Sequence, residues 1–436
     1  MMACTNGPRG PRRTHRPTHY QRMQSRWRLW RPSLAALLAI PLLAALAAGL
    51  AACGDQTVTL ATVFPTTGPD APVGLAMQRA VDLAVRQNAA PGSGYALAVA
   101  HLDEASASFA GDLAALAANS SVVGITGPYG SQAALTLLPV AAQSGIATIS
   151  PGATLPGLTL ADQAQAEKLP FAQLHPKGQP LAFFRLPPTD TAAGRAAADL
   201  AVAPGDAHGF DAGAVFVVDD ASPSGKALAA AFTQELSAKH AAVAGQATIT
   251  LGLLESTGDA VTAIIQANPD LVFYAGGLAT GAALRNTLSL AGAPGLPILT
   301  AGAIADHPGW SAAVGVTPAA ANTAALLPAP GLGTLKSAKD FTTAYQRAYP
   351  GQALLPQSAL AYDAAMDEIT AIRQLIHNNK PVTRAAVRAA VASAKYTGLT
   401  GAITFDANGD RTPPGGFSLY TCDAKGAWHY VATVGG

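Results

Sequence analysis

The chain has 436 residues, of which 50% are hydrophobic and 12% are charged. This composition excludes a mostly disordered chain, which would have too little apolar surface to bury. The first 52 residues hold eight arginines and no acidic residue, so the rest of the chain carries 19 basic and 26 acidic residues, a net charge of −7. Because nucleic-acid binding needs a basic surface, we expect no nucleic-acid partner.

Residues 1–52 predict the signal peptide of a lipoprotein. The arginines precede an uninterrupted apolar run, Leu34 to Ala52, and this order is typical of secretory signals. The run ends in Leu50-Ala51-Ala52-Cys53-Gly54, which resembles the bacterial lipobox, in which the cysteine thiol receives a diacylglyceryl group. We therefore expect lipidation at Cys53, a lipid-anchored linker at 53–57, and a location outside the cytoplasm, on the outer face of the cell membrane or in the periplasm. An uncleaved transmembrane helix is the alternative, and both Met1 and Met23 fit as the start residue.

The three cysteines predict no internal disulfide. Cys4 would leave with the signal peptide and Cys53 would carry lipid, so Cys422 remains alone in the mature chain. It lies in an apolar stretch, which predicts a buried, inert thiol.

From residue 57 onward, short apolar segments alternate with amphipathic ones. The helix predicted over Gly74–Gln87 has its apolar residues on one face. The predicted strands are Thr57–Val63, Tyr95–Ala100, Val122–Thr126, Ile146–Ile149, Ala214–Val218, Thr248–Leu251, Leu271–Tyr274 and Pro297–Thr300. Further helices are predicted at Ser337–Tyr349, Gln357–His377 and Val382–Lys395, before a strand and turn at Gly401–Asp410 and two last strands. Repeated alternation of strand and helix predicts an α/β fold with parallel sheets covered on both faces.

Several motifs occur in an order that resembles the type I periplasmic-type substrate-binding proteins of ABC transporters, in particular the leucine/isoleucine/valine (branched-chain amino acid)-binding family. They are Thr67-Gly68-Pro69, Gly127-Pro128-Tyr129-Gly130-Ser131, Ile149-Ser150-Pro151-Gly152-Ala153-Thr154, Phe184-Arg185 with Asp190 and Gly194, Val218-Asp219-Asp220 with Gly225, Tyr362-Asp363-Ala364 and Gly401–Asp410. The resemblance implies two doubly wound parallel-sheet lobes joined by a three-crossover hinge. It assigns 58–186 with 326–399 to the first lobe and 187–325 with 400–436 to the second.

The predicted ligand site follows from where polar residues fall. Ser131, Gly152 and Thr154 lie just past predicted strand ends, where open α/β sheets bind ligands. Backbone N–H groups in such turns, with a helix N-terminus, make an anion cradle suited to a carboxylate. The resemblance implies that these three residues bind the α-carboxylate and amine of an amino acid. Helix capping is the alternative for Ser131 and Thr154.

The resemblance extends the site to both lobes. It implies that Asp190, from the second lobe, attracts the amine, and N-capping of the helix through Gly194 is the alternative for this residue. Tyr129 and Tyr362 are expected to line the cleft.

Three positions depart from the family pattern. Gly302 stands where the family has its amine-binding glutamate, and Val73 and Leu278 stand at aromatic cleft positions. Only Asp190 then remains as a counter-charge for a buried ammonium, which is costly to leave unpaired. We therefore expect weak binding of leucine, isoleucine and valine, and a preference for a carboxylate or amide with less need of an amine partner.

The chain offers no recognisable catalytic or metal site. It has no G-x-S-x-G, G-x-G-x-x-G or P-loop motif, and its histidines lack metal-ligand spacing. Asp406, Asn408 and Asp410 imitate the first EF-hand ligands, but Arg411 and Phe417 replace the required glycine and glutamate, so a plain turn is predicted.

The sequence thus predicts a non-enzymatic receptor without metal or cofactor. It would capture a small amphipathic solute, an amino acid or related carboxylate or amide, between two lobes and deliver it to an ABC permease. A ligand-sensing subunit of a signalling system without transport is the alternative.

Overall fold

The structure is a computed structural model of the chain, and it describes residues 55–435 except 206, 207, 303, 306, 316 and 336. The predicted signal peptide and the lipidation site at Cys53 lie outside the described residues. No helix within the described part of the chain is long and apolar enough to span a membrane.

The first sheet consists of five parallel strands in the order β2-β1-β3-β4-β5. They are β1 (Gln56–Phe64), β2 (Tyr95–Asp103), β3 (Val122–Thr126), β4 (Ala147–Ser150) and β5 (Phe183–Arg185). Alternate side chains of a strand point to opposite faces, so Val58 and Leu60 of β1 pack in one hydrophobic core and Ala61 and Val63 in another.

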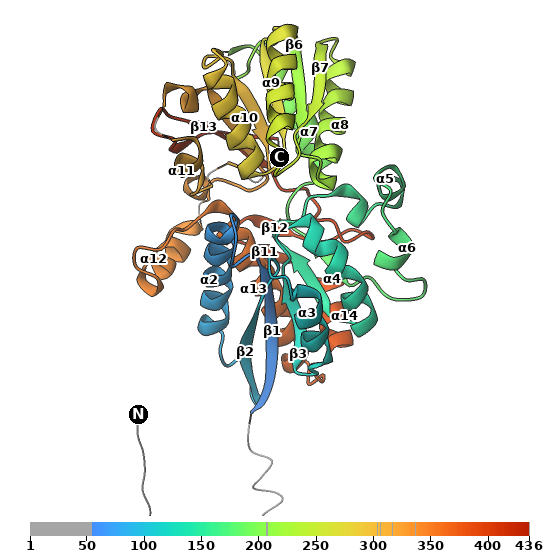
Figure 1. Cartoon of the computed structure of the whole chain (residues 1–436). Coiled ribbons are helices and arrows are strands. Elements are labelled where there is room, and N and C mark those ends of the chain that lie inside the picture. The colour runs from blue at the N-terminus through green and yellow to red at the C-terminus, as the bar shows by residue number, and fades with distance from the viewer. Residues whose placement is uncertain are drawn as a thin grey trace, which may run out of the picture. The chain divides into compact units, whose positions relative to one another are not determined.

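Helices cover both faces of this sheet. One core includes residues of α2 (Ala71–Gln87), α13 (Pro356–His377) and α14 (Arg384–Ala392), and the other includes α3 (Phe109–Ala118) and α4 (Ser131–Ser144). The remaining helical segments of this region are η1 (Pro156–Leu158), α5 (Ala161–Ala166), α6 (Phe171–Leu174), η4 (Leu332–Thr334) and α12 (Ala338–Ala348). In Figure 1 the late, orange helices α12 to α14 accompany the blue and teal elements of the first sheet.

The second sheet has seven strands in the order β14-β13-β10-β9-β8-β6-β7. They are β6 (Ala214–Asp219), β7 (Ala242–Thr248), β8 (Leu271–Ala275), β9 (Ile298–Ala301), β10 (Thr323–Leu327), β13 (Phe417–Cys422) and β14 (Trp428–Val434). The strands are parallel except at β13 and β14, which pair antiparallel. The predicted fold, two doubly wound α/β lobes with parallel sheets, is confirmed apart from this antiparallel edge.

The second sheet is also packed on both faces, because Val215 and Val217 enter one core while Phe216 and Val218 enter another. The first of these cores contains α7 (Asp190–Val202) and α8 (Pro223–Ala238). The second contains α9 (Leu254–Ala267), α10 (Leu278–Leu290) and α11 (Trp310–Val314), with η3 (Pro318–Asn322) beside it. Cys422 is buried here and accepts a hydrogen bond from Trp310 Nε1 at 3.2 Å.

The chain passes between the two sheets three times: after β5, after β10, and after the short hairpin of β11 (Tyr396–Gly398) and β12 (Gly401–Ile403). The predicted boundary at 326 falls inside β10, which lies wholly in the second sheet. The predicted boundary at 400 is also early, because Asp410 still pairs with Arg185 of β5. The last passage therefore comes just before β13.

Strand prediction failed at the edge strand β7, at the three-residue strand β5, and at β10, which is central and fully buried. The prediction at Thr248–Leu251 is wrong, since β7 ends at Thr248. This strand pairs only with β6 and is half-exposed, so it lacks the apolar run that marks buried parallel strands. The three-residue strand β5 was not predicted, and neither was β10.

Candidate functional site

A cavity of about 500 Å³ is lined by residues from both lobes, at the carboxyl ends of parallel strands. Each sheet changes winding direction there, between β1 and β3 in the first and between β6 and β8 in the second. The loops after these four strands supply Asp70, Ser131, Asp220 and Gly277 to the lining. A topological switch point is where open α/β sheets form ligand sites.

Ser131 lines the cavity at the start of α4. Its Oγ accepts hydrogen bonds from the backbone N–H groups of Thr154 and Leu155, each at 3.1 Å. The N-cap of α4 is Gly130, with no side-chain capping bond, so the capping alternative for Ser131 is wrong. Since Oγ already accepts two bonds, its hydroxyl proton can be donated to a ligand acceptor.

Gly152 and Thr154, in the loop after β4, also line the cavity. The N–H groups of Gly152 and Ala153 point to Ser150 Oγ, at 3.3 and 2.8 Å. A Cβ on Gly152 would lie 2.5 Å from Cδ2 of Tyr129, so glycine is required there. The protein's own serines accept these backbone N–H groups in this structure, and binding of a ligand carboxylate by Gly152 and Thr154 stays a prediction.

Glu104 is a lining residue that the sequence analysis missed. Its two carboxylate oxygens accept the N–H groups of Tyr129 and Gly130 at 2.9 and 2.8 Å. Burial raises the pKa of Glu104 to about 8, although these two N–H donors lower it, and the negative charge of Asp70 adds to the rise. The Glu104 carboxyl group thus accepts the backbone N–H groups just before α4, so these groups already have a partner within the protein.

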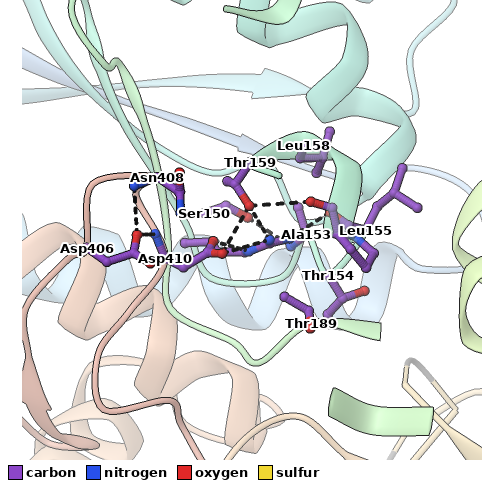
Figure 2. Close-up of polar contacts among 12 residues, drawn as sticks. Ser150, Ala153, Thr154, Leu155, Leu158, Thr159, Thr189, Asp406, Asn408 and Asp410 are labelled. Atoms are coloured by element: carbon purple, nitrogen blue, oxygen red, sulfur yellow. Dashed lines mark hydrogen bonds and ion pairs between the residues drawn. The ribbon is translucent and has the colours of Figure 1, made fainter. Parts of the chain in front are cut away.

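Arg185, whose side chain is fully buried, holds the loop after β4 in place through hydrogen bonds. The guanidinium donates to Asp410 Oδ1 at 2.6 Å, to the carbonyl of Leu155 at 2.7 Å, and to Thr159 Oγ1. Figure 2 shows Asp410 beside the segment from Ser150 to Thr159, with Asp406 accepting N–H groups in the adjacent turn. The predicted turn at Asp406–Asp410 is confirmed. Through its bonds to Arg185 and Thr159, Asp410 connects the segment before β13 to the loop after β4.

Asp190 enters the cavity from the second lobe and is 4% exposed. The N-cap of α7 is Thr189, which accepts the N–H of Ala192, so the capping alternative for Asp190 is wrong. Asp190 Oδ2 is buried without a partner in hydrogen-bonding geometry. Burial raises the pKa of Asp190 to about 6, opposed by the nearby hydroxyls of Thr154 and Ser224 and by the charge of Arg185.

Two further lining residues present buried polar atoms without partners. They are Ser224, through Oγ, and Gln357, through Oε1. Such atoms are rare in folded proteins because each costs free energy, and a polar ligand in the cavity would satisfy them. Ser224 follows β6 and could have been selected by the strand-end rule. Gln357 could not, because α13 follows a passage between the lobes rather than a strand.

Four acids line the cavity: Asp70, Glu104, Asp190 and Asp220. No lysine, arginine or histidine is among the described lining residues. The premise that Asp190 alone could serve as a counter-charge is therefore wrong, and with it the argument for a site that avoids amines. At Gly302 the backbone has φ +101°, so a glutamate there would be strained even though a Cβ would meet open space.

Tyr129 lines the cavity, but Tyr362 does not. Tyr362 donates to Gln87 Oε1 at 2.7 Å, and its ring packs at a tilt against Phe341, with 4.9 Å between the ring centroids. Since Leu360 lines the cavity, a residue two positions later points to the other side of α13. Val73 and Leu278 likewise lie in the hydrophobic cores of their lobes and do not shape the cavity.

Comparison with known proteins gives one family. A sequence model of the periplasmic binding protein family matches residues 57–427. No curated protein sequence matches the chain significantly.

Solved structures share the fold at low sequence identity. The branched-chain amino acid transporter substrate-binding protein LivJ from Streptococcus pneumoniae, in complex with isoleucine, has a TM-score of 0.71 and 21% identity over 87% of this chain and 99% of LivJ. The leucine-binding protein LivK from Thermotoga maritima has a TM-score of 0.70 and 20% identity over 86% and 98% of the two chains. A solute-binding protein of an ABC transporter from R. palustris, in complex with benzoate, has a TM-score of 0.65 and 19% identity over 87% and 96%.

Proposed function

Because the chain belongs to the periplasmic binding protein family, we propose that it is an extracytoplasmic, lipid-anchored receptor that captures an amino acid or similar small carboxylate or amide between its two lobes. It would deliver this solute to an ABC permease. No bond is made or broken: the lobes close on the solute by hinge motion, and the closed form docks on the permease.

The observation that carries this proposal is the pairing of donor and acceptor groups across one cavity. Ser131 of the first lobe has a hydroxyl proton to donate to a carboxylate. Asp190 of the second lobe has a buried, unpartnered oxygen that can accept an ammonium. A solute that carries both groups would join the two lobes. Solved relatives hold isoleucine or benzoate, and both of these ligands carry a carboxylate.

The anchor is proposed from Cys53 and the apolar run before it. Mass spectrometry of the protein from its native membrane should find an acylated Cys53 as the mature N-terminus. Cys53→Ala should leave an uncleaved precursor or an unanchored product. A mature N-terminus elsewhere, without an acyl group, would refute the anchor while leaving the binding proposal intact.

The binding proposal is tested by a thermal-shift screen of amino acids, small carboxylates and amides, because a ligand that binds the native state raises its Tm. Calorimetry on the hits then compares Ser131→Ala with wild type. A hydrogen bond to a charged group contributes about 1.5–3 kcal/mol, so affinity should fall roughly ten- to hundredfold. Ser144→Ala, at the other end of α4 with its hydroxyl bonded to the Val140 carbonyl, is the matched control. Equal affinities for all three proteins would contradict the role of Ser131.

A further inference from the structure

The four acids of the cavity are not equivalent. Asp220 accepts the N–H groups of Ser222 and Gly277 at 3.0 and 2.9 Å, one on each oxygen. Glu104 likewise uses both oxygens to accept backbone N–H groups. These two carboxyls are therefore committed to holding loops of the protein.

Asp70 and Asp190 are the two acids with uncommitted oxygens. Asp70 is the N-cap residue of α2, yet its side chain makes no capping hydrogen bond. Asp190 is 4% exposed, and its Oδ2 is buried without a partner in hydrogen-bonding geometry, with the hydroxyls of Thr154 and Ser224 close enough to lower its pKa. Asp70 lies in the first lobe, after β1, and Asp190 in the second, at the start of α7. The cavity thus has, on each wall, a carboxylate that is not committed to backbone N–H groups of the protein.

One basic residue lies near Asp70. Nε2 of His307 is 3.5 Å from Asp70 Oδ1, and the histidine side chain is fully buried. Its Nδ1 accepts the N–H of Gly309 at 2.9 Å, so the neutral ring carries its proton on Nε2. His307 approaches only one oxygen of Asp70 and is not a lining residue, which leaves the other oxygen to the cavity.

The polar atoms that await a partner are mostly acceptors. Gln357 is 5% exposed, and its unpartnered Oε1 joins Asp70 and Asp190 on the lining. The Asp70 side chain is 43% exposed, whereas Asp190 is buried. Burial of an unpaired carboxylate costs several kcal/mol, so Asp190 favours a solute that brings N–H donors and positive charge over one that brings more anions. A neutral amino acid brings only one ammonium, which a single acid can hold.

We propose that the cavity selects an amino acid with a second positive charge on its side chain, and that Asp70 is the residue that holds this charge. The α-ammonium lies at Asp190 and the carboxylate at Ser131, so this inference rests on the proposed function and names its solute class. Burial is the main cause of the raised pKa of Glu104, and the negative charge of Asp70 on the same wall adds to it. A bound cation offsets that charge.

The experiment compares lysine with norleucine by calorimetry, because the two differ only in the side-chain amino group. Wild-type protein should bind lysine at least tenfold more tightly than norleucine. Asp70→Asn should lower the affinity for lysine by about tenfold more than the affinity for norleucine, since it removes one charged partner. Asp259→Asn is the matched control, because Asp259 is exposed on α9 in the other lobe and its loss changes the net charge equally.

The outcomes separate the two proposals. Norleucine binding as tight as lysine binding would overturn the second cation site and leave the amino acid receptor standing. Preferential lysine binding that Asp70→Asn does not reduce would overturn the assignment to Asp70. If neither compound binds and no amino acid, carboxylate or amide raises the Tm, the receptor proposal fails together with its refinement.

Discussion

Buried acids occur in two regions of this protein, at the cavity and on α13, and they behave differently. At the cavity, Asp190 and Glu104 face a space that a ligand can enter. On α13, Asp363, Asp367 and Glu368 are fully buried and none lines the cavity. Burial raises the pKa of all five carboxyls. A raised pKa alone therefore does not identify the site.

Two of the three acids of α13, Asp363 and Glu368, accept hydrogen bonds from the protein itself. Asp363 accepts the N–H groups of Leu399 and Thr400, each at 2.7 Å, and so fixes the β11–β12 hairpin on the helix. Glu368 accepts the hydroxyl of Thr126 of β3 at 2.7 Å. Neither oxygen of Asp367 has a partner among the described residues. Protonated carboxyls in such places cost less than charged ones.

Whether a ligand can reach a buried acid decides the role of that acid. A buried carboxyl with room beside it can be ionised by an incoming cation, which supplies the missing partner. A sealed carboxyl can only remain protonated or destabilise the fold when it ionises. The acids at the cavity should therefore control ligand affinity, and the acids of α13 should control the free energy of unfolding.

The largest effect is expected for Asp190→Asn on the affinity for an amino acid. Removing one partner of a buried ion pair costs about 3–5 kcal/mol, so affinity for leucine should fall a hundredfold or more. Its deaminated analogue, 4-methyl-2-oxopentanoate, lacks the ammonium and should lose much less. Calorimetry with both compounds measures the contrast.

Asp367→Asn is the control for this experiment, because it changes an acid that is also buried but lies outside the cavity. Its affinity for leucine should equal that of wild type. Equal losses for leucine and the oxo acid in Asp190→Asn would show that Asp190 maintains the shape of the site rather than its charge. A loss of affinity in Asp367→Asn would break the division between the two regions.

The next effect concerns stability and pH. Burial, with the charge of Asp363, raises the pKa of Asp367 from 3.8 to about 7. The folded state therefore binds an extra proton between these values, and stability present below pH 4 is lost as the pH rises through about 7. Asp367→Asn removes this dependence, so the variant should gain on the order of 3 kcal/mol relative to wild type between pH 5 and pH 8.

Urea unfolding at pH 5 and pH 8 measures this gain as a change in midpoint. Asp259→Asn, which removes an exposed acid, should leave the pH dependence of wild type unchanged. If Asp367→Asn keeps the full wild-type loss of stability between pH 5 and pH 8, Asp367 is not protonated in the folded state.

The fold could be predicted largely from the sequence because its strands are buried parallel strands. Val122–Thr126 was predicted with its exact bounds, since both faces of β3 are covered and every residue is apolar or buried. The edge strand β7 was misplaced because half of its side chains meet solvent and carry no apolar pattern. The residues at which the chain passes between the lobes could be predicted only to within several positions. They depend on contacts between residues far apart in the sequence, such as Arg185 and Asp410, which are 225 positions apart.

The site was predictable in part, for a different physical reason. Strand ends converge at one edge of a sheet, so Ser131, Gly152 and Thr154 were predicted to lie together from their positions, whereas Asp190 was predicted only from the family resemblance. Hydrogen bonds within the protein could not be found in this way. Glu104 accepts the N–H groups of Tyr129 and Gly130 only because the loops after β2 and β3 lie next to each other in the fold. The orientation of the Tyr362 side chain depends on how α13 is rotated about its axis when it packs on neighbouring elements.

The smallest expected effect is the pH dependence of ligand affinity that Asp190 causes at the cavity. The pKa of Asp190 is about 6 without ligand, raised by burial, and an ammonium binds the charged carboxylate. Below pH 6 most molecules hold a proton on Asp190, so the apparent affinity for leucine should fall about tenfold between pH 7.5 and pH 5. The ammonium of leucine stays charged over this range, so the fall reports the protein. Asp190→Asn should bind weakly but with no such fall. Affinity that stays constant in wild type down to pH 5 would mean that the α-ammonium lies at another acid, and Asp70 would be the next to test.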